Sequence, residues 1–170
     1  YSIMKKMMAL IGLCIATCIS SFALAQSWPD KTVKVIVPYA PGGGVDPVAR
    51  LVSQKLADIW KQSVVVENKA GGSGTIGANF VAHAPSDGLT ILMSATAEVV
   101  INQHFMQKMS YNPDVDLKPV TLLVKLPFVL VTNPSKPYSN AAELIAFAKK
   151  NPNTVTYASS GPGTPQHLAA

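Results

Sequence analysis

The sequence predicts an α/β domain built on a parallel sheet, and two observations predict it. Short β-branched runs alternate with longer amphipathic stretches, which is the pattern of strands and crossover helices. The first run, VKVIVPYA at residues 33–40, is apolar almost throughout, as in strands buried on both faces of a sheet. With 170 residues, 48% hydrophobic and 14% charged, the chain can bury a core, which excludes disordered, collagen-like and coiled-coil chains.

The elements are predicted in chain order from the same patterns. After the first strand, apolar residues between Val48 and Trp60 recur at helical spacing, with polar residues opposite. Asn140 and Glu143 form a plausible capping pair at the start of another helix. The remaining predictions are strands at 63–66, 89–93 and 155–158, helices at 76–83 and 140–150, a crossing segment at 111–119, and two extended pieces within 121–132. A helix barely begun at the last residues predicts that the sequence is a fragment.

Residues 1–25 have the organisation of a cleaved secretory signal peptide. Lys5 and Lys6 precede an apolar run at 7–19, and the small residues Ala23 and Ala25 flank a cleavage position. The alternative, a membrane anchor, needs about 20 apolar residues, more than this run has. Both cysteines of the chain lie in this segment, so the mature protein has no disulfide. Without Lys5 and Lys6 the net charge falls from +5 to +3, too little for a nucleic-acid surface.

Two strand-to-helix turns share one construction. Pro41 and three glycines precede Asp46 and Pro47, while a Ser-Ser-Gly-Pro-Gly turn at 159–163 precedes Thr164 and Pro165. Asp or Thr before Pro is typical of a helix N-cap followed by the first helical residue. Glycines leave backbone N–H groups bare near the positive end of the helix dipole, where they can hold a carboxylate or a phosphate. Such turns are also common as purely structural features, and Asp46 alone fits a cap better than a ligand-binding group.

A competing motif lies between the two turns. The segment GGSGTIG at 71–77 contains the pattern G-x-G-x-x-G of dinucleotide sites. That site also requires an acidic residue at the end of the next strand, whereas Asp87 precedes that strand and Glu98 follows it. No Gly-Lys-Ser/Thr is present for a P-loop. The sequence therefore predicts no nucleotide cofactor.

Catalytic and metal-binding constellations are not predicted. His83, His104 and His167 lack the spacing of metal ligands, and Ser159 and Ser160 have no partner base. Only His167 follows a glycine turn closely enough to approach a bound anion.

Three blocks of the sequence carry a resemblance that covers nearly all of the mature chain. The blocks WPDKTVKVIVPYAPGGGVDPVARLVSQKL, VVVENKAGGSGTIGANFVAHAPSDGLTILM and TYASSGPGTPQHLA resemble, in this order, the Bug-type receptors of tripartite tricarboxylate transporters. The resemblance implies a two-lobed type II periplasmic binding protein fold with the ligand in the interlobe cleft. It places the first lobe at residues 26–120 and the start of the second at 121–170.

The resemblance also implies a set of ligand-binding residues. They come from the turn after the first strand, the end of the third strand and the second turn: Tyr39, Ala40, Gly42, Gly43, Gly44, Asp46, Ser94, Ser159, Ser160, Gly161, Gly163, Thr164 and His167. Pro162 departs from the family pattern and removes one N–H donor from the second turn.

The function expected from residues and resemblance together is that of a receptor. A small mono- or dicarboxylate binds between the two backbone turns, and the lobes close on it by a hinge motion. The expected partners are the membrane subunits of the transporter, the expected location is the periplasm, and the expected state is a monomer without cofactor, metal or nucleic acid. The alternatives are a secreted enzyme acting on a nucleotide or phosphoester, and a sensory binding protein that informs a regulator.

Overall fold

A computed structural model describes residues 28–170 of the chain. The predicted signal peptide lies outside the described residues. Residues 31–170 form the second of two units of the chain, and this unit contains all the elements described below.

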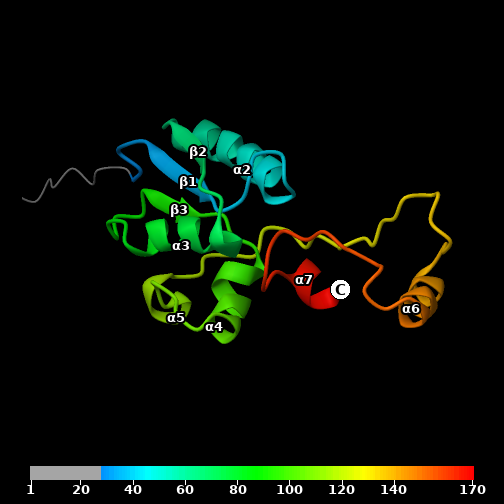
Figure 1. The fold of residues 1–170 in the computed structure, drawn as a ribbon. Coiled ribbons are helices and arrows are strands. Elements are labelled where there is room, and N and C mark those ends of the chain that lie inside the picture. The colour runs from blue at the N-terminus through cyan, green and yellow to red at the C-terminus, as the bar shows by residue number, and fades with distance from the viewer. Residues whose placement is uncertain (1–27) are drawn as a thin grey trace, which may run out of the picture. The chain divides into compact units, whose positions relative to one another are not determined.

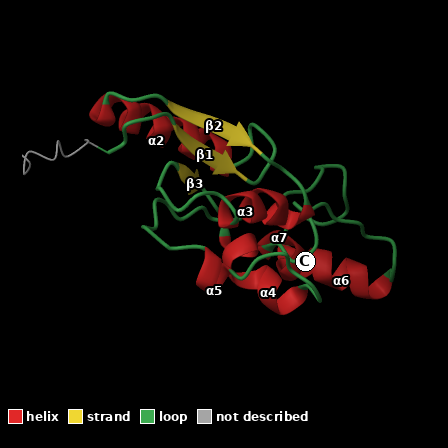
Figure 2. Cartoon of the chain, turned by 90° about the vertical axis from the view of Figure 1, so that its left-hand side faces the viewer, coloured by secondary structure: helices red, strands yellow, loops and turns green. Residues whose placement is uncertain are grey.

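The core of the second unit is a parallel three-stranded sheet, as predicted (Figure 2). Strands β1 (Val33–Val37), β2 (Val64–Asn68) and β3 (Thr90–Leu92) lie in the order β2-β1-β3. Val35 is in register with Val66 on one side and with Ile91 on the other. The first strand of the chain is therefore the central one.

Helices α2 (Val45–Trp60) and α3 (Thr75–Ala82) pack on opposite faces of β1 (Figure 1). Successive side chains of a strand point to opposite faces. Val35 and Val37 accordingly form a cluster with Ala49 of α2, while Pro38 contacts Gly77 of α3. Burial on both faces explains why the β1 run is apolar apart from the exposed Lys34.

Three short elements after β3 were not predicted. A π-helical turn (η2, Ala97–Ile101) leads into α4 (Asn102–Phe105), and α5 (Pro113–Asp116) lies inside the predicted crossing segment. At α5, the Asn112 side chain accepts a hydrogen bond from the N–H of Asp114, so this proline-rich stretch begins a helix rather than remaining extended.

Helices α6 (Ala141–Lys150) and α7 (Pro165–Ala169) confirm the two helices predicted toward the end of the sequence. The predicted capping pair is present: Asn140 Oδ1 accepts from the N–H of Glu143 at 3.0 Å. Glu143 Oε2 in turn accepts from the N–H of Ser139 at 2.6 Å. Thr164 precedes α7 in extended conformation with Pro165 as the first helical residue, as expected.

The strand predicted at 155–158 is wrong, and residues 121–132 contain no strand either. A strand requires a neighbour to bond its backbone groups, and the described residues form no second sheet. The apolar side chains of 121–132 therefore remain largely exposed, Val129 by 78% and Val131 by 83%.

Candidate functional site

The sheet order creates a topological switch point beyond the carboxyl ends of β1 and β3. The chain moves from β1 to β2 on one side and then returns past β1 to β3 on the other. Ligands of open α/β sheets bind where the order reverses in this way. Of the predicted site residues, Tyr39 follows β1 and Ser94 follows β3, so both lie at this switch point.

The first glycine loop, residues 39–46, is held in shape by the side chains of Asp46 and Asn68. Asp46 Oδ2 accepts from the N–H of Gly42 and from Arg50 Nε, each at 3.0 Å. Asn68, at the end of β2, donates to the Tyr39 carbonyl at 3.1 Å and to Asp46 Oδ1 at 2.9 Å. The loop is thus fastened to the helix that follows it and to the neighbouring strand.

The position of Asp46 corrects one expectation. Helix α2 begins at Val45 with Gly44 as its N-cap, so Asp46 is the second helical residue and not the cap. It still stabilises the helix start, because its carboxylate lies in the first turn and reaches back to Gly42. The hydrogen bonds from Arg50, Gly42 and Asn68 lower the pKa of Asp46 to about 2.

The backbone N–H groups of this loop differ in whether they are bonded within residues 28–170. The N–H groups of Gly42, Gly43 and Asp46 are bonded inside the loop, which the sequence did not anticipate. Those of Gly44 and Val45 form no such bond, and they stand at the N-terminus of a helix of 16 residues. Gly44 is exposed, as are all residues of the loop from 40 to 44.

Glu98 is a fully buried carboxyl group at the switch point that sequence analysis did not select as a site residue. It accepts from Tyr39 Oη at 2.6 Å and from the N–H of Ala95 at 2.7 Å. It therefore joins the first glycine loop to the segment that contains Ser94. The signal in the sequence is a single acidic residue within the apolar run ATAEVVI.

Burial governs the titration of this group and its neighbours. Removal from water raises the pKa of Glu98, although the hydrogen bonds from Tyr39 and Ala95 act in the opposite direction. Burial next to this carboxyl also raises the pKa of Tyr39. Tyr111, which donates to the Glu98 carbonyl, has a pKa raised to about 12, mainly by burial.

The second glycine loop, residues 159–164, rests on the segments η1 (Gly72–Gly74) and α4. Ser73 Oγ donates to the Pro162 carbonyl at 2.6 Å. Inside the loop, Ser159 Oγ accepts from the N–H of Gly161 at 3.3 Å, and Thr164 Oγ1 donates to the Gly161 carbonyl at 2.7 Å. Ser160 and Gly163 keep N–H groups without a partner in the described chain.

Asn102 meets this second loop from α4. It is fully buried, and its Nδ2 donates to the Ser73 carbonyl at 3.0 Å, while its Oδ1 has no partner in the described structure. A Cβ on Gly163 would lie 2.9 Å from that Oδ1, so only glycine fits there. Within residues 28–170 no hydrogen bond joins the two glycine loops directly, and each contacts the 97–105 segment instead.

His167 does not stand free beside the second loop. Its Nδ1 lies 3.0 Å from Tyr157 Oη, and its ring packs edge-on to Phe105 at 6.3 Å. The predicted approach of this side chain to an anion remains a prediction.

The competing G-x-G-x-x-G segment is explained by packing. Gly72 and Gly74 adopt positive φ in η1, and a Cβ on Gly74 would lie 2.9 Å from Glu98 Oε2. Gly77 lets α3 approach β1, because a Cβ there would come within 2.8 Å of Pro38 Cβ. Each glycine thus has a structural reason that needs no dinucleotide.

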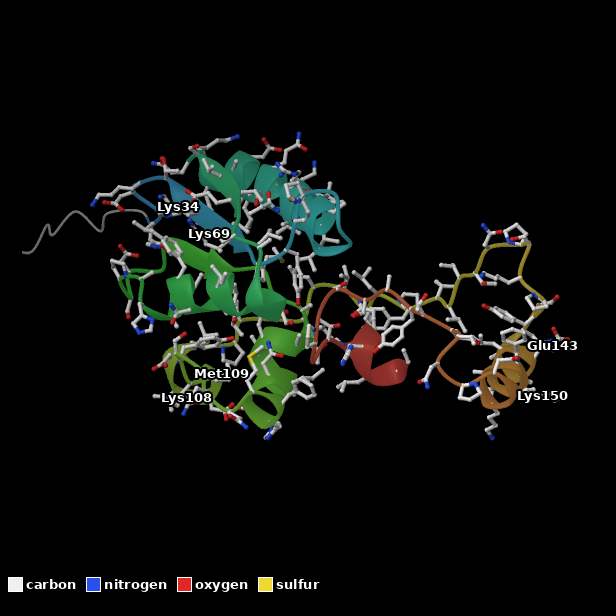
Figure 3. The ribbon with its side chains drawn as sticks, in the orientation of Figure 1. Lys34, Lys69, Lys108, Met109, Glu143 and Lys150 are labelled. Carbon is white, nitrogen blue, oxygen red and sulfur yellow. The ribbon has the colours of Figure 1, made fainter. Side chains whose placement is uncertain are left out.

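The cations on the sheet pair with acids of the chain itself. Glu67 binds Lys34 at 3.2 Å and Lys69 at 3.6 Å, and Lys69 also lies over the ring of Phe80. Figure 3 labels the two lysines. Among the described residues, no cluster of three His, Cys, Asp or Glu residues is arranged to hold a metal. No described helix has the length and apolar character needed to cross a membrane.

Solved structures with the same fold are periplasmic binding proteins. The chain matches a protein of R. palustris solved with adipate at a TM-score of 0.77 and 34% identity, covering 81% of this chain and 46% of that one. It matches the periplasmic binding protein BugD at a TM-score of 0.68 and 34% sequence identity, and the match covers 83% of this chain and 47% of BugD. MatC of Rhodopseudomonas palustris, solved with bound malate, matches at a TM-score of 0.68 and 34% sequence identity, and the match covers 72% of this chain and 42% of MatC.

Curated relatives give the same result at the level of sequence. The chain is 37% identical over 166 residues to a UPF0065 protein from the tcbD-tcbE intergenic region of Pseudomonas sp. strain P51, covering 98% of this chain and 49% of the relative. It is 36% identical over 167 residues to the protein BugT of Bordetella pertussis, covering 97% and 51%. The chain thus spans about half the length of these relatives.

The fold and its neighbours define the class as periplasmic solute-binding proteins, which confirms the predicted fold class. Residues 48–170 match the model of the tripartite tricarboxylate transporter family receptor. The chain belongs to that family.

Proposed function

We propose that the whole protein is a periplasmic receptor that captures a small carboxylate between two lobes and presents it to the membrane subunits of a tripartite transporter. One observation carries the proposal: the exposed first glycine loop at the switch point, with unbonded N–H groups at Gly44 and Val45. Membership of the receptor family supports the class of function, and adipate and malate bound to neighbouring structures support the class of ligand.

The proposed site combines Ser94 with the predicted residues of both glycine loops other than Asp46. The ligand carboxylate accepts hydrogen bonds from backbone donors and is stabilised by the dipole of α2, without a cationic side chain. Asp46 does not bind the ligand in this arrangement, because it is buried and both its oxygens accept hydrogen bonds inside the protein.

The division into lobes at 26–120 and 121–170 remains a prediction, as do the signal peptide, the periplasmic location and the monomeric state. The second glycine loop, with its unbonded N–H groups at Ser160 and Gly163, would supply the donors of the second lobe. Closure of the lobes would bring these donors onto the ligand.

A ligand screen tests the proposal. The mature protein is heated with about thirty small carboxylates, and with NAD and ATP as probes of the enzyme alternative. A ligand at 100 times its dissociation constant stabilises the folded state by about 2.7 kcal/mol, which raises the melting temperature measurably. We expect a shift with a group of related carboxylates, whereas shifts with NAD or ATP alone would contradict the receptor function.

A pair of variants tests the backbone donor. Gly44 has φ near −57°, which suits both alanine and proline. Gly44→Pro deletes the N–H and is expected to weaken carboxylate binding about 10- to 100-fold, the range for a hydrogen bond to a charged group. Gly44→Ala adds the same Cβ beside Leu126 but keeps the N–H, so its affinity is expected to stay near wild type. Equal affinities for the two variants, measured by titration calorimetry, would exclude Gly44 from the site.

A further inference from the structure

We propose that Ser73 is a positioning residue of the candidate site: it holds the second glycine loop, residues 159–164, against the predicted first lobe and so fixes where that loop presents its N–H donors. This inference rests on the proposed function and names what controls the geometry of the same site. It concerns a contact between segments that lie 89 residues apart in the sequence.

The hydrogen bond between Ser73 and the second glycine loop is the first support. Ser73 Oγ donates to the Pro162 carbonyl at 2.6 Å. Within the described chain, this is the one hydrogen bond that joins the loop to residues 28–120, because its other bonds are internal or lead into α7. The place of the loop relative to the sheet therefore depends on this hydroxyl group and on packing.

The close fit of the loop is the second support. A Cβ on Gly161 would lie 2.8 Å from Ser73 Oγ, and a Cβ on Gly163 would lie 2.9 Å from Asn102 Oδ1. Gly163 is buried, whereas residues 158–160 are exposed. The loop is thus buried where it meets α4 and exposed where the serines precede its glycines.

The backbone conformation of Ser73 is the third support. Its φ is +53°, in the left-handed region that costs conformational energy for most residues other than glycine. A serine in this place, between two glycines, indicates that the side chain has a role. Ser73 is also fixed itself, because its carbonyl accepts from Asn102 Nδ2 at 3.0 Å and the next residue, Gly74, is the N-cap of α3.

In this proposal Ser73 acts through the loop and does not touch the ligand. Pro162 lies between Ser160 and Gly163, the two residues whose N–H groups have no partner in residues 28–170. Donors that are held in place before binding lose less conformational entropy, which favours affinity. Affinity differences between variants of one site lie mostly in the dissociation rate. Loss of the Ser73 bond is therefore expected to speed dissociation.

Two hydroxyl deletions test the inference in the mature protein, with adipate and malate as probes. Ser73→Ala removes the bond to the second loop, and Thr75→Val removes the local bond from Thr75 Oγ1 to the Gly72 carbonyl. We expect Ser73→Ala to weaken binding about 2- to 10-fold, the range for a neutral hydrogen bond, through faster dissociation in stopped-flow mixing. Thr75→Val is expected to bind as the wild type does.

The pair separates positioning from stability, because each variant loses one hydroxyl hydrogen bond of the same segment. A general loss of stability would affect both variants, so a change confined to Ser73→Ala identifies a positioning role. Wild-type kinetics in Ser73→Ala, or equal changes in the two variants, would overturn the inference and leave the receptor function standing.

A disulfide tests the place of the loop directly. A Cβ at residue 161 would lie 3.8 Å from Ser73 Cβ, within the range of about 3.5–4.5 Å for disulfides. Residues 26–170 contain no cysteine. Ser73→Cys is combined with Gly161→Cys and treated with oxidised glutathione. The reduced form of the same double variant is the control, since it carries the same backbone strain at residue 161, where φ is +127°.

We expect the disulfide to form and the oxidised protein to release the probes more slowly than the reduced protein. Weaker binding after oxidation would show that the loop binds ligand elsewhere, and free thiols after oxidation would show that Ser73 does not meet the loop. Either result refutes the inference.

The proposed function fails in a different way. If neither adipate nor malate binds the wild type, the carboxylate with the largest shift in the thermal screen replaces them as the probe. An empty screen contradicts the receptor function, whereas thiol titration of the double variant still decides whether Ser73 meets the second loop.

Discussion

The carboxylate of Asp46 joins three parts of the first glycine loop region: Gly42 in the turn, Arg50 on the helix and Asn68 at the strand end. A loop fastened in this way is fixed before any ligand arrives. Preorganised backbone donors lose little conformational entropy on binding, which favours affinity. Asp46, which the sequence indicated as a helix cap, therefore acts as a clamp, that is, as the residue whose hydrogen bonds hold the loop in shape.

Acidification should release this clamp. The pKa of Asp46 is lowered to about 2 from its ordinary value of 3.8, so its contribution to stability is complete above pH 4 and is lost as the pH falls toward 2. We expect Asp46→Asn to have a lower urea midpoint of unfolding than the wild type at pH 6. At pH 2.5 the midpoints of the variant and the wild type should lie closer together. Asp58→Asn, at an exposed position of the same helix, serves as the control. A difference from wild type that is the same at both pH values would contradict this account.

Gly77 is a second residue whose effect is local and measurable. A Cβ there would lie 2.8 Å from Pro38 Cβ and 2.9 Å from Pro38 Cα, so α3 would have to move away from β1. We expect Gly77→Ala to destabilise the fold by about 1–3 kcal/mol, as overpacking does. Gly43→Ala is the matched control, since its Cβ would meet only the Ala40 carbonyl at 3.4 Å. Chemical denaturation gives the free energy of unfolding of both variants. Equal decreases in this free energy would refute the packing explanation.

Among the helices of eight or more residues in the described chain, α6 depends most on its own sequence, because none of its residues is buried whereas α2 and α3 have buried residues. Its stability rests on the reciprocal bonds around Asn140 and Glu143 and on Lys149 and Lys150 in its last turn. A helix of 10 residues without packing is marginal in water.

Asn140→Ala should therefore unfold α6 without disturbing the sheet. Loss of an Asn cap costs about 1 kcal/mol, and this helix has little tertiary packing to compensate. We expect faster amide exchange at Leu144 and Phe147 with unchanged protection in β1, measured by NMR. Asn133→Ala, which removes a side-chain cap from a loop turn, should leave α6 unaffected. Unchanged exchange at Leu144 would show that packing holds the helix.

The elements also show how far the sequence could lead. The strand at Val33 and the helix after it were predictable, because one is apolar on both faces and the other amphipathic over 16 residues. The π-helical turn at 97–101 was not, since five residues carry too little periodicity, and its position depends on the burial of Glu98. The strand at 155–158 was wrong because a β-branched pattern does not reveal whether a partner strand is present.

The same limit applied to the site. Glycine turns identified the loops, and the chain order of the strands was enough to expect both at carboxyl ends. What the sequence could not show was which N–H groups the loops use for themselves. Gly42 donates its N–H to Asp46, and Ala95 donates its N–H to Glu98, and both of these local bonds depend on the backbone conformation of the turn, which residue types alone do not reveal.

On the scale of the whole molecule, the segment 121–132 exposes most of its apolar side chains. Val129 and Val131 are among its most exposed side chains, and neither contributes to the buried core. Exposed apolar stretches with high β-propensity promote association between chains.

Charged residues in this segment should improve solubility at little cost in stability. For the 170-residue chain, the double variant Val129→Lys and Val131→Lys is expected to reduce light scattering on heating. Its free energy of unfolding should change by no more than about 0.5 kcal/mol, as for other surface substitutions. A larger loss would show that the segment packs against the sheet in solution.

The central place of β1 in the sheet has a consequence for biosynthesis. Lys34 pairs with Val65 on one side and with Thr90 on the other, so both strands that pair with β1 are synthesised after it. Because chains emerge from the ribosome N-terminus first, the three-stranded sheet cannot be completed until residue 92 has been made. A nascent chain of the first sixty residues contains the β1 and α2 sequences but neither of the two strands that pair with β1.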